Sequence, residues 1–367
     1  HGSMYVANSI IKTLIKNGAR QAERGEFSKR AFLNGKMDLT RAESVMDLIA
    51  ANGRLAARTA LAAHEGGIFR RLQQIKEPLV AACTQCGAFV DYPDDDIPEL
   101  APDALRQTVT AALDGIGALL DTFDAGQVLR EGIDTAIVGS PNVGKSTLMN
   151  CLAGCERSIV TEVAGTTRDV VEDTVRLGEI LLHLADTAGI RDTADRVETV
   201  GVEKARTRMA NAALVLAVFD GSRALTDADR ALAEALTDAA AIAVINKADM
   251  PEKTDRAYLQ AHFRHVVTLS AQTGDGLDAL TEAVATVTGI EALDSAEPIL
   301  ENERQRQCAL QCRDCLNEAL DALDAGLTVD AVTVSLHGAI DAINALTGER
   351  TTETVVDGIF ARFCVGK

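Results

Sequence analysis

The chain has 367 residues, 47% of them hydrophobic, so it is long enough for two or three domains and at least one large core. Its 54 acidic and 36 basic residues give a formal net charge of −18, which excludes general charge-driven binding to nucleic acid. A nucleic-acid substrate would need a local basic patch or delivery by a partner. No apolar run approaches the roughly 20 residues of a membrane span, and no signal peptide is evident. The eight cysteines are therefore expected to be reduced thiols of a cytoplasmic protein.

The first third of the chain is expected to become helical after a short mixed segment. Residues 1–34 show no clear hydrophobic period. Residues 35–128 are rich in Ala and Leu, and their apolar residues recur at three- and four-residue spacing, which predicts amphipathic helices. Pro93 and Pro98 interrupt this pattern and predict a turn between helices.

Strands and helices alternate between residues 129 and 296. Because helical segments separate most of the strands, the pattern indicates a mostly parallel six-stranded sheet with helices on both faces. Residues 297–367 return to long helical patterns. The simplest organisation is an α/β domain inserted between two halves of an all-α domain. The predicted strands are IDTAIVG, VVEDTVRL, ILLHLAD, ALVLAVFD, AIAVIN and HVVTLSA.

A phosphate-binding loop is predicted at GSPNVGKS, residues 139–146, between the first strand and a helix. Its glycines allow consecutive backbone N–H groups to converge on phosphates at the helix N-terminus. Lys145 is expected to reach the β- and γ-phosphates, and the Ser146 hydroxyl is expected to ligate Mg²⁺. The predicted phosphate-side residues are Asn142, Val143, Gly144, Lys145, Ser146 and Thr147.

Three further segments, DTAG, NKAD and SAQTG, follow predicted strands, at the edge where open α/β sheets bind ligands. In DTAG, Asp186 is expected to hold Mg²⁺ through water and the Gly189 N–H to contact the γ-phosphate. In NKAD, Asp249 can accept two hydrogen bonds from guanine, whereas adenine would leave the carboxylate unpaired. Each segment alone fits an ordinary turn, but the four in this order indicate a guanine-nucleotide site. The remaining base-side residues are Asn246, Lys247, Ser270 and Ala271.

The residue after DTAG raises a question about hydrolysis. A glutamine often follows this turn and orients the attacking water. Here the position is Ile190, whose side chain cannot form a hydrogen bond to water. Either the chain does not hydrolyse its nucleotide, or another group positions the water.

The motif set resembles Ras-type GTPases, and further segments resemble the MnmE (TrmE) family of bacterial tRNA modification GTPases. Those segments are TEVAGTTRD, GEFSKRAFLNGKMDLTRAE and FCVGK, with the flanking helical regions. The resemblance implies a Ras-like G domain at 129–296, inserted into a helical domain made of 35–128 and 297–367. Residues 1–34 would be the C-terminal part of an α+β folate-binding and dimerisation domain, whose first part is expected to be missing.

The resemblance also implies how hydrolysis proceeds without a glutamine. Family members carry a hydrophobic residue at the position of Ile190 and are thought to orient the water with a glutamate, which corresponds to Glu198. From the residues alone, a solvated carboxylate is the simpler interpretation of Glu198, and only the resemblance favours the role in hydrolysis. A potassium ion replaces an arginine finger when two G domains meet, and Thr167 completes the Mg²⁺ shell. The corresponding potassium ligands are Asn142, the Thr161 and Val163 carbonyls, and Thr166.

The family acts with the flavoprotein MnmG (GidA) on C5 of the wobble uridine of certain tRNAs. It uses a tetrahydrofolate one-carbon unit and an amine donor, and GTP hydrolysis drives association and release of G domains in a homodimer. The resemblance makes Cys364 a candidate catalytic residue near the folate. Arg30 and Lys36 could face a folate glutamate tail. From the residues alone, Cys364 could be inert and Arg30 and Lys36 a solvated basic pair.

Two alternatives concern the cysteines and the function. Cys308, Cys312 and Cys315 have the spacing of a radical S-adenosylmethionine cluster, but positions along one helix face favour buried thiols. Together with Cys83 and Cys86 they could bind zinc. The alternative function is an Era-like or Der-like ribosome-assembly GTPase, for which a basic RNA-binding module or a second G domain would be expected.

Overall fold

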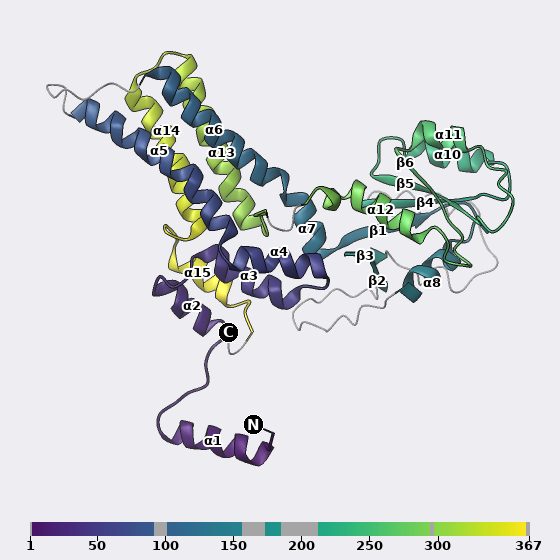
Figure 1. The fold of residues 1–367 in the computed structure, drawn as a ribbon, viewed down its shortest axis with the longest axis horizontal. Coiled ribbons are helices and arrows are strands. Elements are labelled where there is room, and N and C mark those ends of the chain that lie inside the picture. Colours follow the sequence, from purple (N-terminus) through teal and green to yellow (C-terminus); the bar gives the residue numbers. More distant parts are fainter. Residues whose placement is uncertain (1, 92–100, 156–172, 185–211, 294–296, 365–367) are drawn as a thin grey trace. The chain divides into compact units, whose positions relative to one another are not determined.

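The computed structural model describes residues 2–91, 101–155, 173–184, 212–293 and 297–364 (Figure 1). The chain divides into two compact units, and each is described separately. The first contains His1–Ile49, Ala63–Ile116 and Gln307–Lys367. The second contains Ala50–Ala62 and Gly117–Arg306. The predicted turn at Pro93 and Pro98 lies outside the described residues.

The first unit is built from helices, as the Ala- and Leu-rich periodicity predicts. Helix α6 begins at Pro102, a position where the missing N–H of proline has no helical partner to lose. The helices that lie wholly or mostly in this unit are α1 Met4–Lys16, α2 Glu26–Leu33, α3 Leu39–Ala50, α5 Gly67–Asp91, α6 Pro102–Asp121, α13 Glu303–Asp324, α14 Val329–Thr347 and α15 Glu353–Phe360.

Four long helices, α5, α6, α13 and α14, lie side by side in this unit (Figure 1). Helix α5 packs against α14. Helices α13 and α14 approach closely at Gly338, where an added Cβ would lie 2.9 Å from Sγ of Cys315. Arg106 of α6 pairs with Asp324 of α13 at 2.6 Å. A small residue and an ion pair thus position the bundle, while buried side chains supply its stability.

A smaller core joins α2, α3 and α15. The ring of Phe32 in α2 lies 6.3 Å from that of Phe360 in α15, centroid to centroid. Leu39 is completely buried between these helices. This cluster connects the N-terminal segment to the C-terminal helix, which brings sequence-distant residues together.

The second unit contains a six-stranded sheet in the order β2-β3-β1-β4-β5-β6. All neighbouring strands are parallel except β2 and β3, which form an antiparallel hairpin. The predicted mostly parallel sheet is therefore confirmed. The strands are β1 Ile133–Val138, β2 Asp173–Leu177, β3 Ile180–Leu184, β4 Leu214–Asp220, β5 Ala241–Asn246 and β6 His265–Thr268.

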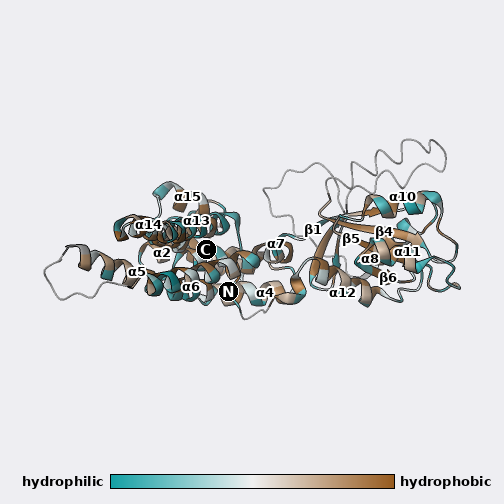
Figure 2. Ribbon diagram, turned by 90° about the horizontal axis from the view of Figure 1, so that it is seen from above, coloured by the Kyte–Doolittle hydropathy of each residue, from teal (hydrophilic) through white to brown (hydrophobic). Residues whose placement is uncertain are grey.

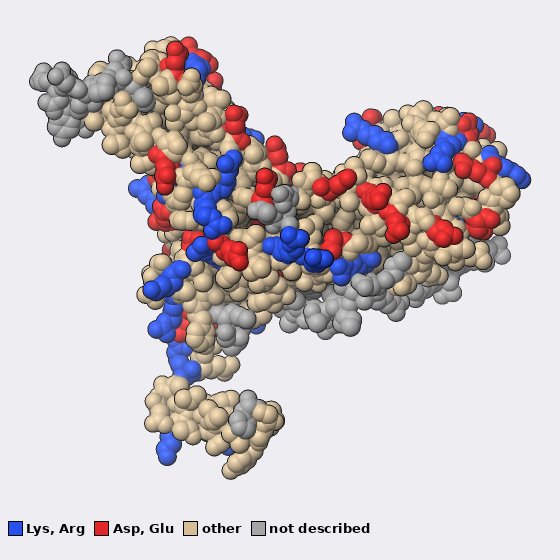
Figure 3. Space-filling view, viewed as in Figure 1, with Lys and Arg blue, Asp and Glu red and all other residues tan. Residues whose placement is uncertain are grey.

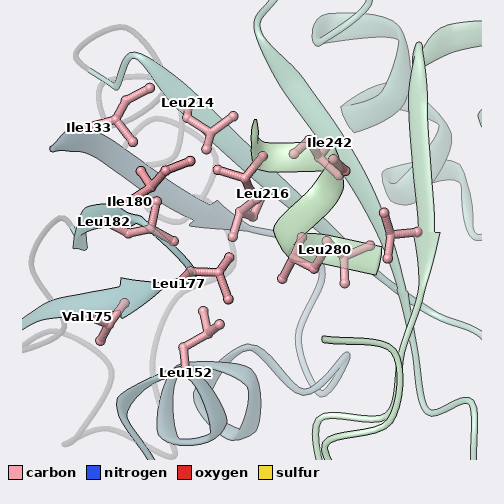
Figure 4. Close-up of a cluster of buried hydrophobic side chains, with 14 of the residues drawn as sticks. Ile133, Leu152, Val175, Leu177, Ile180, Leu182, Leu214, Leu216, Ile242 and Leu280 are labelled. Carbon is pink, nitrogen blue, oxygen red and sulfur yellow. The ribbon is translucent and has the colours of Figure 1, made fainter. Parts of the chain in front are cut away.

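Both faces of the sheet are covered, because alternate residues of the central strands point to opposite sides. In β4, Leu216 belongs to one core and Ala217 to the other. Figure 4 shows Leu152 of a helix and Leu280 of another on the side of strand residues such as Leu182. The central strands are accordingly coloured as hydrophobic in Figure 2.

The helices of this unit cover the two faces. Helices α8 and α12 contribute to one core, and α10 and α11 contribute to the other. The two cores fix the sheet from both faces. The loops of the candidate site begin where its parallel strands end. The helices are α4 Arg54–His64, α7 Phe123–Glu131, α8 Lys145–Cys155, α10 Asp227–Ala235, α11 Arg256–His262, α12 Leu277–Val287 and the 3₁₀ helix η1 Ile290–Ala292.

Among the described residues, no helix combines the length and apolar character needed to cross a membrane.

Candidate nucleotide-binding site

Four loops follow the carboxyl ends of the parallel strands β1, β4, β5 and β6. Parallel strands place their carboxyl ends at the same edge of a sheet, so these loops lie together. The predicted phosphate loop follows β1, and NKAD and SAQTG follow β5 and β6. The three segments therefore lie at the same edge of the sheet.

The phosphate loop needs glycine at two positions. An added Cβ at Gly139 would lie 2.4 Å from the carbonyl oxygen of Val218, and one at Gly144 would lie 2.2 Å from Nδ2 of Asn246. Both have positive φ, +152° and +96°. Asn142 also has a positive φ of 64°, which asparagine tolerates better than most residues. The loop is thus held in one conformation close to its neighbours.

Lys145 is the first residue of α8, and its side chain folds back over the phosphate loop. Its ammonium donates hydrogen bonds to the carbonyl oxygens of Gly139 and Ser140, both at 2.8 Å. Burial lowers the pKa of Lys145, because removal from water penalises its charged form. Ser146 and Thr147 follow in the exposed first turn, where helical N–H groups lack intrahelical partners. These features together suit a phosphate group.

Asn246 connects two loops of the site. Its Nδ2 donates to the Val143 carbonyl at 2.9 Å, and its Oδ1 accepts from the Ala271 N–H at 3.0 Å. The residue is only 2% exposed. Asn246 was predicted as a base-side residue, and in the structure its amide joins the phosphate loop to the loop after β6. That role depends on how closely the loops after β1, β5 and β6 approach one another, which the sequence does not show.

Asp249 presents an exposed carboxylate on the base side of the site. The hydroxyl of Ser270, a residue 1% exposed, donates to its Oδ1 at 2.7 Å. This contact orients the carboxylate while leaving acceptor capacity for a ligand. An oriented carboxylate at this position suits a pair of adjacent N–H donors, as on the edge of guanine.

Lys247 adopts a positive φ of 68° and pairs with Asp220 at the end of β4, with Nζ 2.6 Å from Oδ2. Burial alone would raise the pKa of Asp220, but hydrogen bonds from Lys247 and Ser222 outweigh it and lower that pKa. Asp220 therefore stays ionised and holds the Lys247 side chain. Asp220 was not among the predicted site residues, although its place at the end of a predicted strand was an available signal.

The other residues predicted for the nucleotide site lie outside the described residues, as does Ile190. They are Thr161, Val163, Thr166, Thr167, Asp186, Gly189 and Glu198.

Comparison with known proteins decides the family. The model of the MnmE helical domain matches residues 39–364, and that of the GTP-binding protein TrmE N-terminus matches residues 1–36. The chain belongs to the MnmE family. The tRNA modification GTPase MnmE of Thermoanaerobacter sp. (strain X514) is 37% identical over 371 residues, covering 100% of this chain and 80% of its own. That of Latilactobacillus sakei subsp. sakei (strain 23K) is 40% identical with the same coverage.

Among solved structures, the G domain of the T. maritima FeoB iron transporter aligns with 42% of this chain and 98% of its own. Its identity is 26% and its TM-score 0.32, so it carries no weight in the assignment. The MnmE matches span nearly the whole chain. The Era-like or Der-like alternative is therefore not favoured.

The residues that the MnmE resemblance connects with folate lie in the first unit. Lys36 lines a groove of about 810 Å³ whose other lining residues include Phe32, Met37 and Phe69. Arg30 is exposed on α2 and is not part of that lining. The lining also carries charged groups of both signs, from Lys29, Arg41, Asp38, Glu349 and Glu353. Cys364 is exposed, and its carbonyl accepts from the Gly25 N–H at 3.3 Å.

Two of the cysteines that lie in helices, Cys83 and Cys312, are free and buried thiols. Cys312 is completely buried in α13, and burial raises its pKa to about 12. Cys83 is buried in α5, and burial raises its pKa to about 11. Among the described residues, no group of three or more His, Cys, Asp or Glu side chains could hold a metal ion. In this MnmE family member, burial makes both thiols poor nucleophiles.

Proposed function

We propose that this protein binds and hydrolyses GTP, and that its GTPase cycle serves modification of C5 of the wobble uridine of certain tRNAs together with MnmG. The observation that carries the proposal is the connection made by Asn246 between the phosphate loop and the loop after β6, next to the oriented carboxylate of Asp249. Phosphate and guanine recognition are thereby combined in one site. Family membership supports the same activity.

The described residues divide the recognition of GTP between them. The ammonium of Lys145 would hydrogen-bond the β- and γ-phosphate oxygens, and the N–H groups at the start of α8 would contact the same charge. Asp249 would accept hydrogen bonds from N1–H and N2–H₂ of guanine, and the Lys247 stem would cover the base. Ser146, with Thr167 and Asp186, would hold Mg²⁺, which neutralises charge developing on the phosphates.

The remaining question is how water is positioned next to Ile190. We assign this role to Glu198, whose carboxylate would accept a hydrogen bond from the attacking water. Asn142, with the Thr161 and Val163 carbonyls and Thr166, would hold K⁺, which stabilises charge on the β–γ bridging oxygen. Asn142 fits this role because its exposed amide lies on the phosphate loop itself. A second G domain would close the site, so hydrolysis would be coupled to association of two copies.

The tRNA is expected to bind with MnmG rather than to this chain alone. Figure 3 shows acidic and basic side chains interspersed on the visible described surface of each unit. With a net charge of −18, such a surface gives little general attraction for a polyanion. A tetrahydrofolate derivative would bind near Lys36 and Arg30, and Cys364 is the candidate residue for its chemistry.

The test is GTP turnover by the full chain in matched KCl and NaCl buffers, with and without Mg²⁺. Wild type is compared with Glu198→Ala and with Asn142→Ala. We expect turnover to be stimulated at least tenfold by K⁺, to lose that stimulation in Asn142→Ala, and to fall in Glu198→Ala while GTP still binds. ATP serves as the control nucleotide, because adenine lacks the donors that Asp249 accepts.

Each outcome has a meaning for the proposal. Equal rates in the two salts at a protein concentration that supports association would overturn the potassium site. Turnover of Glu198→Ala equal to wild type would overturn the role of Glu198. Failure to bind GTP, or equal binding of ATP, would overturn the activity itself. Co-elution of this protein with MnmG in gel filtration is expected, and it checks the partnership.

A further inference from the structure

A continuous series of polar contacts connects the phosphate loop with the base side of the site, away from the Asn246 connection. The Ser140 hydroxyl donates to Oδ1 of Asp229 at 2.6 Å. Nη1 of Arg223 donates to Oδ2 of Asp229 at 2.8 Å, and Nε of Arg223 lies 3.8 Å from Oδ2 of Asp220. That same oxygen of Asp220 accepts from Nζ of Lys247 at 2.6 Å. We call these five residues the Ser140–Lys247 network.

Asp229 is the centre of this network and is 1% exposed. Its Oδ2 also accepts from the N–H and hydroxyl of Thr226, at 3.0 and 2.8 Å, as part of the capping box of α10. Burial alone would raise the pKa of Asp229, but hydrogen bonds led by that from Ser140 lower it. The carboxylate is therefore ionised, and both oxygens are used. A helix cap needs only the Thr226 contacts, so the bond to Ser140 is an additional function of this residue.

Ser140 is well placed to transmit that contact to the phosphates. It is the second residue of GSPNVGKS, and its own carbonyl accepts from the Lys145 ammonium at 2.8 Å. Asp229 thus holds the side chain of a residue whose backbone holds Lys145. A shift of Ser140 would move the acceptor that positions this ammonium, and small displacements of such groups weaken ligand binding.

The other end of the network lies on the base side. Asp220 is 7% exposed, and its two oxygens accept from Ser222 and Lys247. Arg223 bridges Asp220 and Asp229, and its rigid guanidinium can contact two carboxylates at once. The two carboxylates are therefore held in one arrangement by a single cation between them.

We propose that Asp229 is a positioning residue for GTP. Through Ser140 it fixes the phosphate loop, and through Arg223 and Asp220 it couples that loop to Lys247. The proposal rests on the proposed function, since it assumes that this site binds GTP. Its consequence is that the contacts on the phosphate side and on the base side strengthen each other. Breaking the network at one residue should therefore weaken nucleotide binding as much as breaking it at two.

The test is a double-mutant cycle between Ser140→Ala and Asp229→Ala in the full chain. The readouts are the Kd of a fluorescent GDP analogue and the KM and kcat for GTP. A hydrogen bond to a charged group corresponds to an effect of about 10- to 150-fold. We expect each single variant to raise Kd and KM by about that factor, kcat to stay within about twofold, and the double variant to bind no more weakly than Asp229→Ala.

A matched control separates positioning from stability. Asp255 is the N-cap of α11 in the same unit, accepts from the Tyr258 N–H at 3.1 Å and is not part of the network. Asp255→Ala removes the N-cap side chain of α11, and Asp229→Ala removes the reciprocal capping-box contact of α10. Asp255→Ala should lower the unfolding temperature without changing Kd. A change in Kd for Asp255→Ala comparable to that for Asp229→Ala would overturn the positioning role.

The remaining outcomes distinguish this proposal from the proposed function. If wild type does not bind the GDP analogue or GTP, the proposed function fails. If wild type binds and the effects of the two substitutions multiply to within about twofold, the coupling is absent and this proposal fails. If Asp229→Ala does not fold, Arg223→Ala replaces it in the same cycle, and independence of Ser140→Ala and Arg223→Ala overturns the proposal equally.

Discussion

Replacement of Asn246 by alanine tests the central connection of the site. Asn246→Ala removes the donor to the Val143 carbonyl and the acceptor from the Ala271 N–H. Val143 is 0% exposed and Ala271 6% exposed, so water cannot readily replace either partner. A buried backbone group that loses its partner costs about 1–2 kcal/mol, so the two together predict a loss of about 2–4 kcal/mol in the free energy of unfolding.

The measurement is urea unfolding followed by circular dichroism, because the chain contains no tryptophan. The two units can unfold separately, so the relevant transition is the one that GDP shifts to higher urea concentration. We also expect the KM for GTP to rise at least tenfold, because the phosphate loop and the loop after β6 are no longer connected. Asn150→Ala, at an exposed position of α8, is the control and should change stability by less than about 0.5 kcal/mol.

The reasoning is refuted if Asn246→Ala lowers stability by less than about 1 kcal/mol, which would mean that the two backbone groups find other partners. Asn246→Asp sharpens the test. A carboxylate could still accept from the Ala271 N–H, but it would face the Val143 carbonyl without a donor. It should therefore be no better than alanine, and recovery of wild-type stability by aspartate would show that the contact to Val143 contributes nothing.

Three further predictions concern Gly144, Asp229 and the cysteines. Gly144→Ala forces a Cβ to within 2.2 Å of Asn246 at a φ of +96° and should cost about 2–3 kcal/mol. Gly154→Ala, in α8 and with open space around an added Cβ, should be neutral or stabilising in urea unfolding, and equal effects of the two substitutions would contradict the argument. Because its hydrogen bonds hold the pKa of Asp229 below the usual value, its contribution is complete above about pH 4 and lost as the pH falls lower. Asp229→Asn should therefore flatten the acid limb of the curve of stability against pH below about pH 4, and an unchanged limb would count against this linkage. Iodoacetamide at pH 8 should label the exposed Cys364 in the native protein. It should label Cys312, whose pKa burial raises to about 12, only after unfolding. Peptide mass mapping measures both labelling rates, and equal rates in the native protein would refute the burial argument.

Much of the fold followed from local patterns. The six strands were predicted from short β-branched or apolar runs, and the alternation with helices indicated a mostly parallel sheet, which the structure confirms. Hydrophobic periodicity depends on residues two to four apart, so it survives in a single sequence. The antiparallel pairing of β2 with β3 was not predicted. They are joined by a turn at Gly178 and Glu179, too short for the crossover that parallel neighbours need.

The sequence by itself determined which chemistry the site can perform. The spacing in GSPNVGKS and the carboxylate of NKAD are local features, and the rule for parallel strands placed them at one edge. Only the tertiary structure decided how the loops are held together. Asn246 and Val143 are 103 positions apart, and Ser140 and Asp229 are 89 apart. Such contacts depend on strand order and loop conformation, which no local pattern encodes, and for that reason the roles of Asn246 and Asp229 emerge only when the sheet is assembled.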